Sequence, residues 1–226
     1  MYANSRHIVS NQQHLHPRLA AVVARHLVTV SRKPMARHNI QAFEQLQRRL
    51  QLSPRALVLD SFCGTGHSTV TLAERHPDHL VVGIDKSGRR LQRHPPLRPD
   101  NCLLLQADCA AIWQLLAARK LAVDYHYLLY PNPWPKARHL QRRIHGHASF
   151  PLLLQLAASG RPGRLQLRSN WQTYVEEFGV ALHLAGVRGS VSRVSAAQAL
   201  TLFEQKYRDS GHSLWQLSAD GGRATP

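Results

Sequence analysis

The sequence predicts an α/β protein in which helices flank both faces of a mostly parallel central sheet. Five short runs are apolar without alternation, which is typical of strands buried on both faces. Helical patterns separate these runs, as expected when parallel strands are joined by crossover helices. Three of the runs end in an aspartate, at Asp60, Asp85 and Asp108. Since ligands of open α/β sheets bind at the carboxyl ends of the strands, these acids indicate one binding edge.

The elements follow in order along the chain. Residues 1–54 predict a basic helical N-terminal extension with two helices, one opening at His16-Pro17 and one capped by Asn39. The predicted strands are 56–60, 80–85, 102–108, 125–130 and 163–168, and the predicted helices are 68–76, 87–93, 110–119, 144–158 and 171–184. A long polar stretch and an aromatic-bearing segment, 213–217, come next. Residues 221–226 are expected to form a flexible tail.

Composition excludes several classes of protein. The 226 residues are 43% hydrophobic, which argues against disorder, and no apolar run is long enough for a membrane span. Lys and Arg number 29 against 13 Asp and Glu, so the net charge of +16 favours a nucleic-acid partner over a membrane. Without a signal-type start, and with three unpaired cysteines (Cys63, Cys102, Cys109), a cytoplasmic protein without a metal site is expected.

A glycine loop follows the first predicted strand, in the order Asp60-Ser61-Phe62-Cys63-Gly64-Thr65-Gly66. Two glycines let the backbone turn tightly and approach a ligand. The third small residue of a dinucleotide fingerprint and the lysine of a P-loop are absent, so a pyrophosphate is not expected. Asp85 stands where a carboxylate takes ribose hydroxyls. Asp108 could accept from an adenine amine, or could equally be a helix N-cap. A cationic nucleoside without phosphate, S-adenosylmethionine, fits this edge best.

A second candidate site follows the fourth predicted strand, at Tyr130-Pro131-Asn132-Pro133-Trp134-Pro135-Lys136. Three prolines in five positions predict a stiff loop. Asn132 can read a base edge and Trp134 offers a stacking surface, while Lys136, Arg138, His139, Arg142 and Arg143 supply positive charge. The combination indicates RNA recognition at the edge where the cofactor's methyl group would lie.

Residues 130–143 closely resemble the hallmark Phe-x-Asp-Pro-Trp-x-Lys-x-Arg-His-x-x-Arg-Arg of the bacterial tRNA guanine-N7 methyltransferases, the TrmB-like family. Ser169-Asn170-Trp171 is similar to the family's Thr-Asp-Trp, and Thr201-Leu202-Phe203-Glu204 to its Thr-x-Phe-Glu segment. The resemblance covers residues 55–217. It implies a methyltransferase domain at 55–220 with the Rossmann-like class I S-adenosylmethionine-dependent fold. It also implies methyl transfer to N7 of guanosine 46 in the tRNA variable loop, by a monomer or homodimer.

The resemblance and the residue types together give three groups of candidate residues. The expected catalytic residues are Asn132, which orients the base, and Glu204, which favours the positive charge that develops on the purine. The expected cofactor-binding residues are Asp60, Phe62, Gly64, Gly66, Asp85, Lys86, Asp108 and Cys109. The expected substrate-binding residues are Trp134, Lys136, Arg138, His139, Arg142, Arg143, Asn170 and Thr201.

Two departures from the family pattern leave alternatives open. Asn132 and Asn170 each stand where the family has aspartate. Guanine N7 has a lone pair and no proton, so no general base is needed, and losing one charge-assisted hydrogen bond costs roughly 1–2 kcal/mol. The alternatives are another RNA, an exocyclic base amine as acceptor, or an RNA-binding relative without catalysis.

Overall fold

The computed structural model describes residues 5–29, 34–160, 163–195 and 199–223. Its sheet has seven strands in the order β3-β2-β1-β4-β5-β7-β6. β1 pairs in parallel with β2 and β4, β2 with β3, and β4 with β5, whereas β7 is antiparallel to β5 and β6. The strands are β1 (Ala56–Ser61), β2 (His79–Asp85), β3 (Cys102–Gln106), β4 (Val123–Leu129), β5 (Arg164–Ser169), β6 (Val187–Arg193) and β7 (Trp215–Arg223). The predicted α/β fold with a mostly parallel sheet is confirmed.

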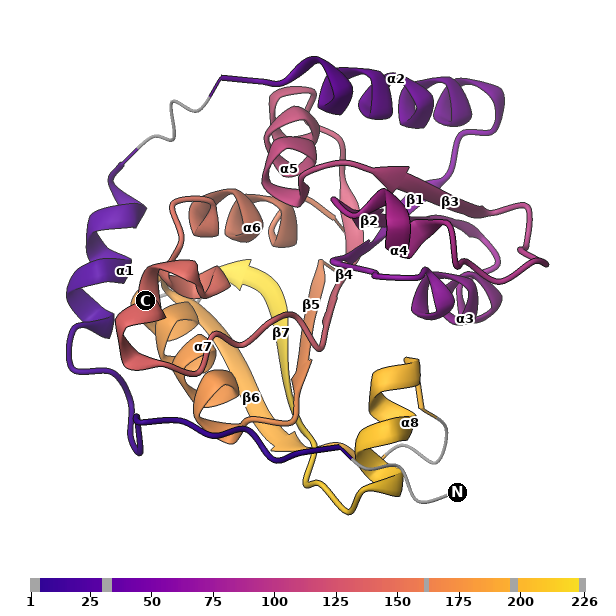
Figure 1. Ribbon diagram of the computed structural model, residues 1–226. Coiled ribbons are helices and arrows are strands. Elements are labelled where there is room, and N and C mark those ends of the chain that lie inside the picture. Colours follow the sequence, from indigo (N-terminus) through magenta and orange to yellow (C-terminus); the bar gives the residue numbers. More distant parts are fainter. Residues whose placement is uncertain (1–4, 30–33, 161–162, 196–198, 224–226) are drawn as a thin grey trace.

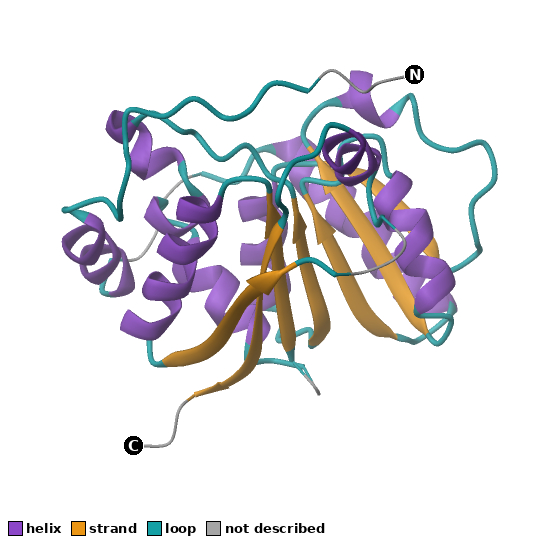
Figure 2. Cartoon of the chain, turned by 90° about the horizontal axis from the view of Figure 1, so that it is seen from below, coloured by secondary structure: helices purple, strands orange, loops and turns teal. Residues whose placement is uncertain are grey.

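Helices cover both faces of this sheet (Figures 1 and 2). They are α1 (Leu19–Leu27), α2 (Arg37–Leu52), α3 (His67–Arg75), α4 (Gly88–Leu91), α5 (Cys109–Ala118), α6 (Phe150–Ala157), α7 (Gln172–Leu184) and α8 (Leu202–Asp209), with 3-10 turns η1 (Ala137–Arg142) and η2 (Ile144–Gly146). Alternate residues of β1 divide between two cores. Leu57 and Leu59 join the large cluster with α1, α2, α5, α6 and α7, while Val58 joins the smaller cluster with α3. The unbroken apolar run of β1 follows from this burial on both sides.

The N-terminal helices are part of the main core. Val23 of α1 and Leu46 of α2 are fully buried in the same cluster as the strands. Asn39 lies inside α2 rather than at its cap, and its Oδ1 accepts a hydrogen bond of 2.9 Å from the Asp108 backbone N–H. The predicted extension therefore packs as an integral layer of the domain.

Several boundaries differ from the sequence-based expectation. The single helix expected over 144–158 is the turn η2 followed by α6, which begins at Phe150 with Pro151 in its first turn. β7 continues to Arg223, into the expected tail, while residues 224–226 lie outside the described part of the chain.

Strand β6 and helix α8 were not anticipated because neither shows a continuous apolar run. Most of β6 is exposed at the edge of the sheet, and Glu204 is the buried residue of α8. Edge strands keep polar side chains, so their hydrophobic signal is weak.

Among the described residues, no helix is long and apolar enough to cross a bilayer. The cysteines Cys63, Cys102 and Cys109 are free.

Two leucines of α2 test whether the N-terminal helices belong to the core. Leu46 is 0% exposed and Leu52 is 82% exposed. Leu46→Ala is expected to lower the free energy of unfolding by about 2–5 kcal/mol, because it leaves a cavity in the main cluster. Leu52→Ala should change it by less than about 0.5 kcal/mol. Urea denaturation measures both, and equal values for the two variants would contradict this packing.

Candidate functional site

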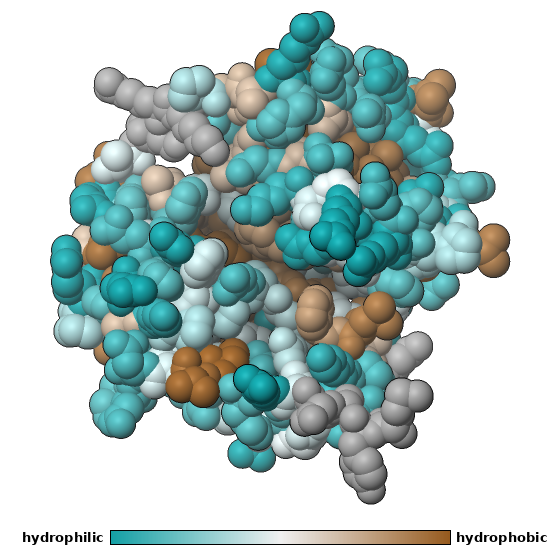
Figure 3. Space-filling view, viewed as in Figure 1, coloured by the Kyte–Doolittle hydropathy of each residue, from teal (hydrophilic) through white to brown (hydrophobic). Residues whose placement is uncertain are grey.

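A cavity of about 660 Å³ opens at the carboxyl ends of β1, β2 and β4. It is lined by residues of the glycine loop, the ends of β2 and β4, the start of α5 and the start of α8. Figure 3 shows an apolar hollow in the middle of this face with hydrophilic side chains around it. The two sites predicted from the sequence therefore share one cavity.

The glycine loop forms one wall with bare backbone. Gly64 has φ +61°, and a Cβ added there would meet no atom within 4 Å, so this glycine presents its backbone to open space. Its N–H donates to Asp85 Oδ2 at 3.0 Å, which fixes the loop to the end of β2. Gly66 has φ +76° and begins α3, but its absent side chain makes room for Leu104. Gly66 thus shapes the loop without lining the cavity.

An aromatic pair lies beside this wall. Phe62 has φ +65°, an uncommon conformation for a side chain of this size, and is 37% exposed in the cavity. Its ring packs edge to face against that of Trp113, with 6.0 Å between the ring centroids. Trp113 Nε1 donates to Ser61 Oγ at 3.0 Å. Cys109, buried beneath them, also lines the cavity, and burial raises the pKa of its thiol. Together they give the cavity an apolar end.

Asp85 supplies the cavity's buried carboxylate. It is 2% exposed, and its oxygens accept from the backbone N–H groups of Gly64 (3.0 Å) and Ser87 (2.8 Å). Arg90 Nη2 lies 3.1 Å from its Oδ1. The carboxylate is thus held in one orientation at the cavity wall, beside the exposed Lys86.

Asp108 has the structure of a helix cap and also lines the cavity. Its Oδ1 accepts from the Ala111 N–H at 3.3 Å, at the start of α5. Its own N–H donates to Asn39 of α2. The N-cap interpretation is therefore correct, and Asp108 still contributes to the cavity wall.

Asp60 does not line the cavity, which corrects its assignment as a cofactor contact. It is 0% exposed beneath the glycine loop, where Ser68 Oγ and Thr69 Oγ1 donate to its Oδ2 at 2.6 and 2.7 Å. Burial raises the pKa of the Asp60 carboxyl to about 6, against the two hydroxyl donors that lower it. This acid organises the start of α3.

The proline-rich loop after β4 forms the opposite wall. Tyr130 and Trp134 both have positive φ, +53° and +48°, so the loop holds two non-glycine residues in left-handed conformations. Asn132 Oδ1 accepts from the Trp134 N–H at 3.1 Å. The guanidinium of Arg142 lies 4.9 Å from the centre of the Trp134 ring. Asn132, Trp134 and Arg142 all line the cavity.

Arg143 is not a surface cation, which corrects its assignment as an RNA contact. It is 0% exposed, and its Nη1 donates to the fully buried Glu177 Oε2 at 2.5 Å. Lys136 and Arg138 are exposed and His139 is half-buried, and none of these three lines the cavity. Their place is the surface beside it.

Glu204 is likewise an anchor rather than a cavity residue, which corrects its catalytic assignment. It is 0% exposed, and Arg168 Nη1 donates to its two oxygens at 2.9 and 3.1 Å, while Arg208 Nη2 lies at 3.3 Å. The neighbouring Thr201 caps α8 by accepting from the Glu204 N–H at 2.9 Å, and Thr201 does line the cavity. The Thr-x-Phe-Glu segment is thus a helix N-terminus locked to β5.

Asn170 also lies away from the cavity, against its expected contact with the substrate. Its side-chain amide is 3.4 Å from His212 Nδ1, and His212 Nε2 is 3.0 Å from the Ser5 carbonyl oxygen.

Some cavity residues were missed by the sequence analysis. Arg90, Trp113, Phe203 and Lys206 line the cavity, and Glu177 and Arg168 hold its loops. Phe203 lies within the Thr-x-Phe-Glu segment, so the resemblance to the family could have indicated it as a site residue. Glu177 shares a helix with Glu176, and nothing in the sequence separates the two.

A comparison with known families decides the class of the protein. A family model described as "Putative methyltransferase" matches residues 54–217, which span the whole cavity. The chain belongs to this family, the TrmB family of methyltransferases.

Curated relatives of this family member share about 30% identity with it. A tRNA (guanine-N(7)-)-methyltransferase from Leifsonia xyli is 29% identical over 166 residues, covering 68% of this chain and 71% of the relative. Enzymes of the same name from Sodalis glossinidius and Burkholderia thailandensis are 30% and 28% identical, covering 68% and 71% of this chain. The chain spans 67% and 62% of the length of these two relatives.

Solved structures show the same fold at low identity. The 16S rRNA (adenine(1408)-N(1))-methyltransferase from Catenulisporales acidiphilia, with cosubstrate SAM, has a TM-score of 0.52 and 20% identity, covering 81% of this chain and 92% of that one. An antibiotic-related methyltransferase has a TM-score of 0.53 and 14% identity, covering 86% and 97%. These structures show that the chain has the fold of the class I S-adenosylmethionine-dependent methyltransferases. The family to which the chain belongs depends on S-adenosylmethionine.

The residues present fit this cofactor. The bare backbone at Gly64 leaves room that a side chain would fill, and the held carboxylate of Asp85 suits ribose hydroxyls. The apolar end around Phe62 and Cys109 suits an adenine ring. The residues reach these positions from three neighbouring strand ends.

The buried Asp60 predicts a specific dependence of stability on pH. Because its folded pKa of about 6 exceeds its ordinary value of 3.8, its contribution favours folding below pH 4 and is lost as pH rises through 6. The difference between these two pKa values corresponds to about 3 kcal/mol of unfolding free energy. As pH rises from 4 to 7, the free energy of unfolding of Asp60→Asn should therefore increase by about that much relative to that of the unsubstituted chain. Urea denaturation at each pH measures both values.

Asp78→Asn is the control, because Asp78 is exposed. A difference between the Asp60 variant and the unsubstituted chain that stays constant across this range would contradict the burial of an ionisable carboxyl at position 60.

Proposed function

We propose that the protein transfers a methyl group from S-adenosylmethionine to N7 of guanosine 46 in the variable loop of tRNA. One observation carries this proposal. The loop with Trp134 and Arg142 lines the same cavity as Gly64 and Asp85. A purine held by the first pair would therefore lie beside a nucleoside cofactor held by the second. The curated relatives are tRNA (guanine-N(7)-)-methyltransferases, which supports N7 of a tRNA guanine as the acceptor.

The cofactor half of the proposed site is the glycine-loop side. Phe62, Cys109 and Trp113 would enclose the adenine, Asp85 would accept from the ribose hydroxyls, and Asp108 and Lys86 would complete the wall. When bound there, S-adenosylmethionine supplies an activated methyl group. The chain's own task is to hold this end rigidly, which the two backbone donors to Asp85 accomplish.

The substrate half lies between the proline-rich loop and α8. Trp134 offers a ring for stacking, and Phe203 of α8, which also lines the cavity, is 55% exposed. A guanine unstacked from the RNA can be held between such aromatic surfaces, which repay the cost of unstacking. Arg142 and Lys206, also at the cavity, add positive charge for the adjoining phosphates.

Asn132 is the polar group best placed to orient the base. It is exposed at the cavity, and its Oδ1 accepts from the Trp134 N–H, so its NH₂ group remains a donor toward the ligand. A donor there matches the O6 acceptor of guanine. Guanine N7 carries a lone pair and no proton, so alignment suffices and no base is required. Glu177 and Glu204, which are buried and do not line the cavity, are accordingly not required as bases.

The surface cations would guide the RNA to this pocket. Lys136 and Arg138 are exposed next to the loop, and the chain carries a net charge of +16. Contacts of this kind bind phosphates without reading sequence, and they weaken as salt rises.

Analysis of the modified nucleoside tests the proposed function. The purified protein is incubated with labelled S-adenosylmethionine and an unmodified tRNA transcript, which is then digested to nucleosides. Label is expected in 7-methylguanosine, and it should disappear when the transcript carries adenosine at the variable-loop position. Label in N6-methyladenosine, or none at all, would overturn the proposal.

Two substitutions should separate the two halves of the site. Asp85→Ala is expected to weaken cofactor binding by about tenfold or more, because ribose and the Gly64 loop both lose their acceptor, while RNA affinity stays unchanged. Arg138→Ala should weaken RNA binding and reduce the slope of log affinity against log salt by about 1, with cofactor binding intact. Calorimetry with S-adenosylhomocysteine and filter binding with tRNA measure the two effects, and the reverse pattern would refute the division.

A further inference from the structure

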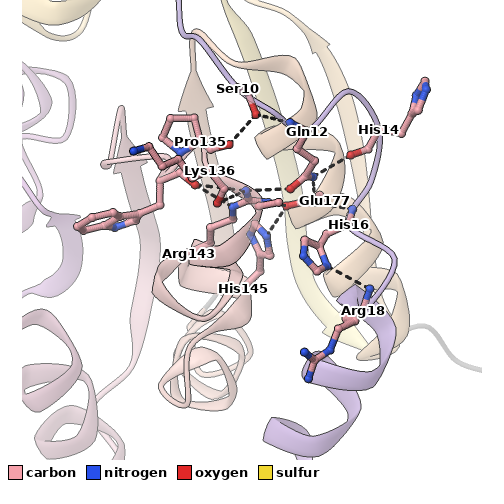
Figure 4. Close-up of polar contacts among 12 residues, drawn as sticks. Ser10, Gln12, His14, His16, Arg18, Pro135, Lys136, Arg143, His145 and Glu177 are labelled. Atoms are coloured by element: carbon pink, nitrogen blue, oxygen red, sulfur yellow. Dashed lines mark hydrogen bonds and ion pairs between the residues drawn. The ribbon is translucent and has the colours of Figure 1, made fainter.

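The N-terminal residues Ser10–His16, here called the strap, lie against the back of the proline-rich loop (Figure 4). Ser10 Oγ donates to the Pro135 carbonyl oxygen at 2.5 Å. Asn11 Oδ1 accepts from the Ala137 N–H at 3.0 Å. These contacts join segments more than 120 residues apart, and no residue of the strap lines the cavity.

Behind the loop, the strap completes a buried charge cluster. Glu177 and Arg143 are both 0% exposed and paired at 2.5 Å. Gln12 bridges them, because its Nε2 donates to Glu177 Oε1 at 2.6 Å and its Oε1 accepts from Arg143 Nη2 at 3.0 Å. The His16 backbone N–H donates to the same Glu177 oxygen at 2.8 Å, and His145 Nε2 is 3.1 Å from the other.

Arg143 also donates hydrogen bonds to the backbone of the proline-rich loop. Its Nε and Nη2 donate to the Trp134 carbonyl oxygen at 3.3 and 3.2 Å, and Nη2 also reaches the Lys136 carbonyl oxygen at 3.4 Å. Trp134 has φ +48°, a conformation that a bulky residue keeps only when its surroundings impose it. Arg143 holds the carbonyl oxygen of this residue, and the Asn132 side chain accepts from its N–H.

We propose that Glu177, Arg143 and Gln12 are positioning residues that fix the Trp134 backbone, and that the strap is thereby a working part of the substrate site. The inference rests on the proposed function for the claim that Trp134 receives a base. If the loop were released from this cluster, Trp134 would no longer be held in one orientation. The base stacked on it would then less often be aligned with the methyl group of the cofactor.

The chemistry of position 12 suits this role. The side chain there must donate to a carboxylate and accept from a guanidinium, both within 3.0 Å. An amide does both, whereas a carboxylate would repel Glu177 and an ammonium would repel Arg143.

Hydrogen exchange of the loop tests the proposal directly in the full chain. The substitution is Gln12→Met, which keeps the length of the side chain and removes both hydrogen bonds, and the control is Gln13→Met, at an exposed neighbour. Three prolines leave few reporter amides, of which Trp134, Lys136 and Ala137 are the useful ones. Their exchange is expected to be about tenfold faster in Gln12→Met and unchanged in Gln13→Met, with amides of β1–β3 unchanged in both.

Equal loop exchange in the two variants would overturn the proposal. A rise that spreads equally to the strands would also overturn it, because that pattern reports lost global stability. This measurement needs no substrate, so it decides the inference even if the protein methylates something other than tRNA.

Kinetics provide the functional half of the test. Gln12→Met is expected to lower kcat for RNA methylation about tenfold while the Kd for S-adenosylhomocysteine stays the same, and Glu177→Gln should lower it further. Glu176→Gln on the same helix is the matched control and should retain activity. If Glu177→Gln does not fold, Gln12→Met alone decides. An unchanged kcat beside a lowered melting temperature would show a purely structural role.

Discussion

Two buried guanidinium–carboxylate pairs are the interactions on which the substrate side of this cavity depends. Arg143–Glu177 holds the proline-rich loop and Arg168–Glu204 holds the start of α8. Burying such charges is costly unless they are partnered. Glu177, Arg143 and Glu204 gain further backbone or side-chain partners, whereas the buried Arg168 Nε has no hydrogen-bond partner among the described residues. The two pairs thus tie the proline-rich loop and the start of α8 to the core, and both segments line one cavity.

The sheet explains why the two halves of the site face each other. β1 and β2 end at the glycine loop and the held carboxylate of Asp85. β4 ends at the proline-rich loop, and Arg168 near the end of the neighbouring β5 holds the start of α8. The first half is apolar with an acid, which suits a nucleoside. The second combines aromatic rings with cations, which suits an unstacked base with its phosphates. For the proposed transfer to guanine N7, neither half needs a proton-transfer group, and the buried Glu177 and Glu204 hold the cavity's segments in place.

Much of this could be predicted from the sequence, for identifiable reasons. Continuous apolar runs such as Leu57–Leu59 reveal strands buried on both faces, and the Trp134 motif with its prolines and cations marks the substrate loop. The orientation of a side chain within such a loop is not encoded locally. Arg142 and Arg143 are neighbours, yet one stacks over Trp134 in the cavity and the other is buried behind it. Glu204 was misjudged for the same reason, and Gln12 was overlooked because its partners lie more than 130 residues away.

In the proposed function, one cavity aligns a nucleoside cofactor with a purine stacked on Trp134. A crystal structure of the protein with S-adenosylhomocysteine and a guanosine-containing RNA stem-loop tests it most directly. The account predicts the ribose hydroxyls on Asp85, the guanine ring against Trp134, and N7 facing the sulfur. A guanine bound away from Trp134, or a ribose that does not touch Asp85, would contradict it.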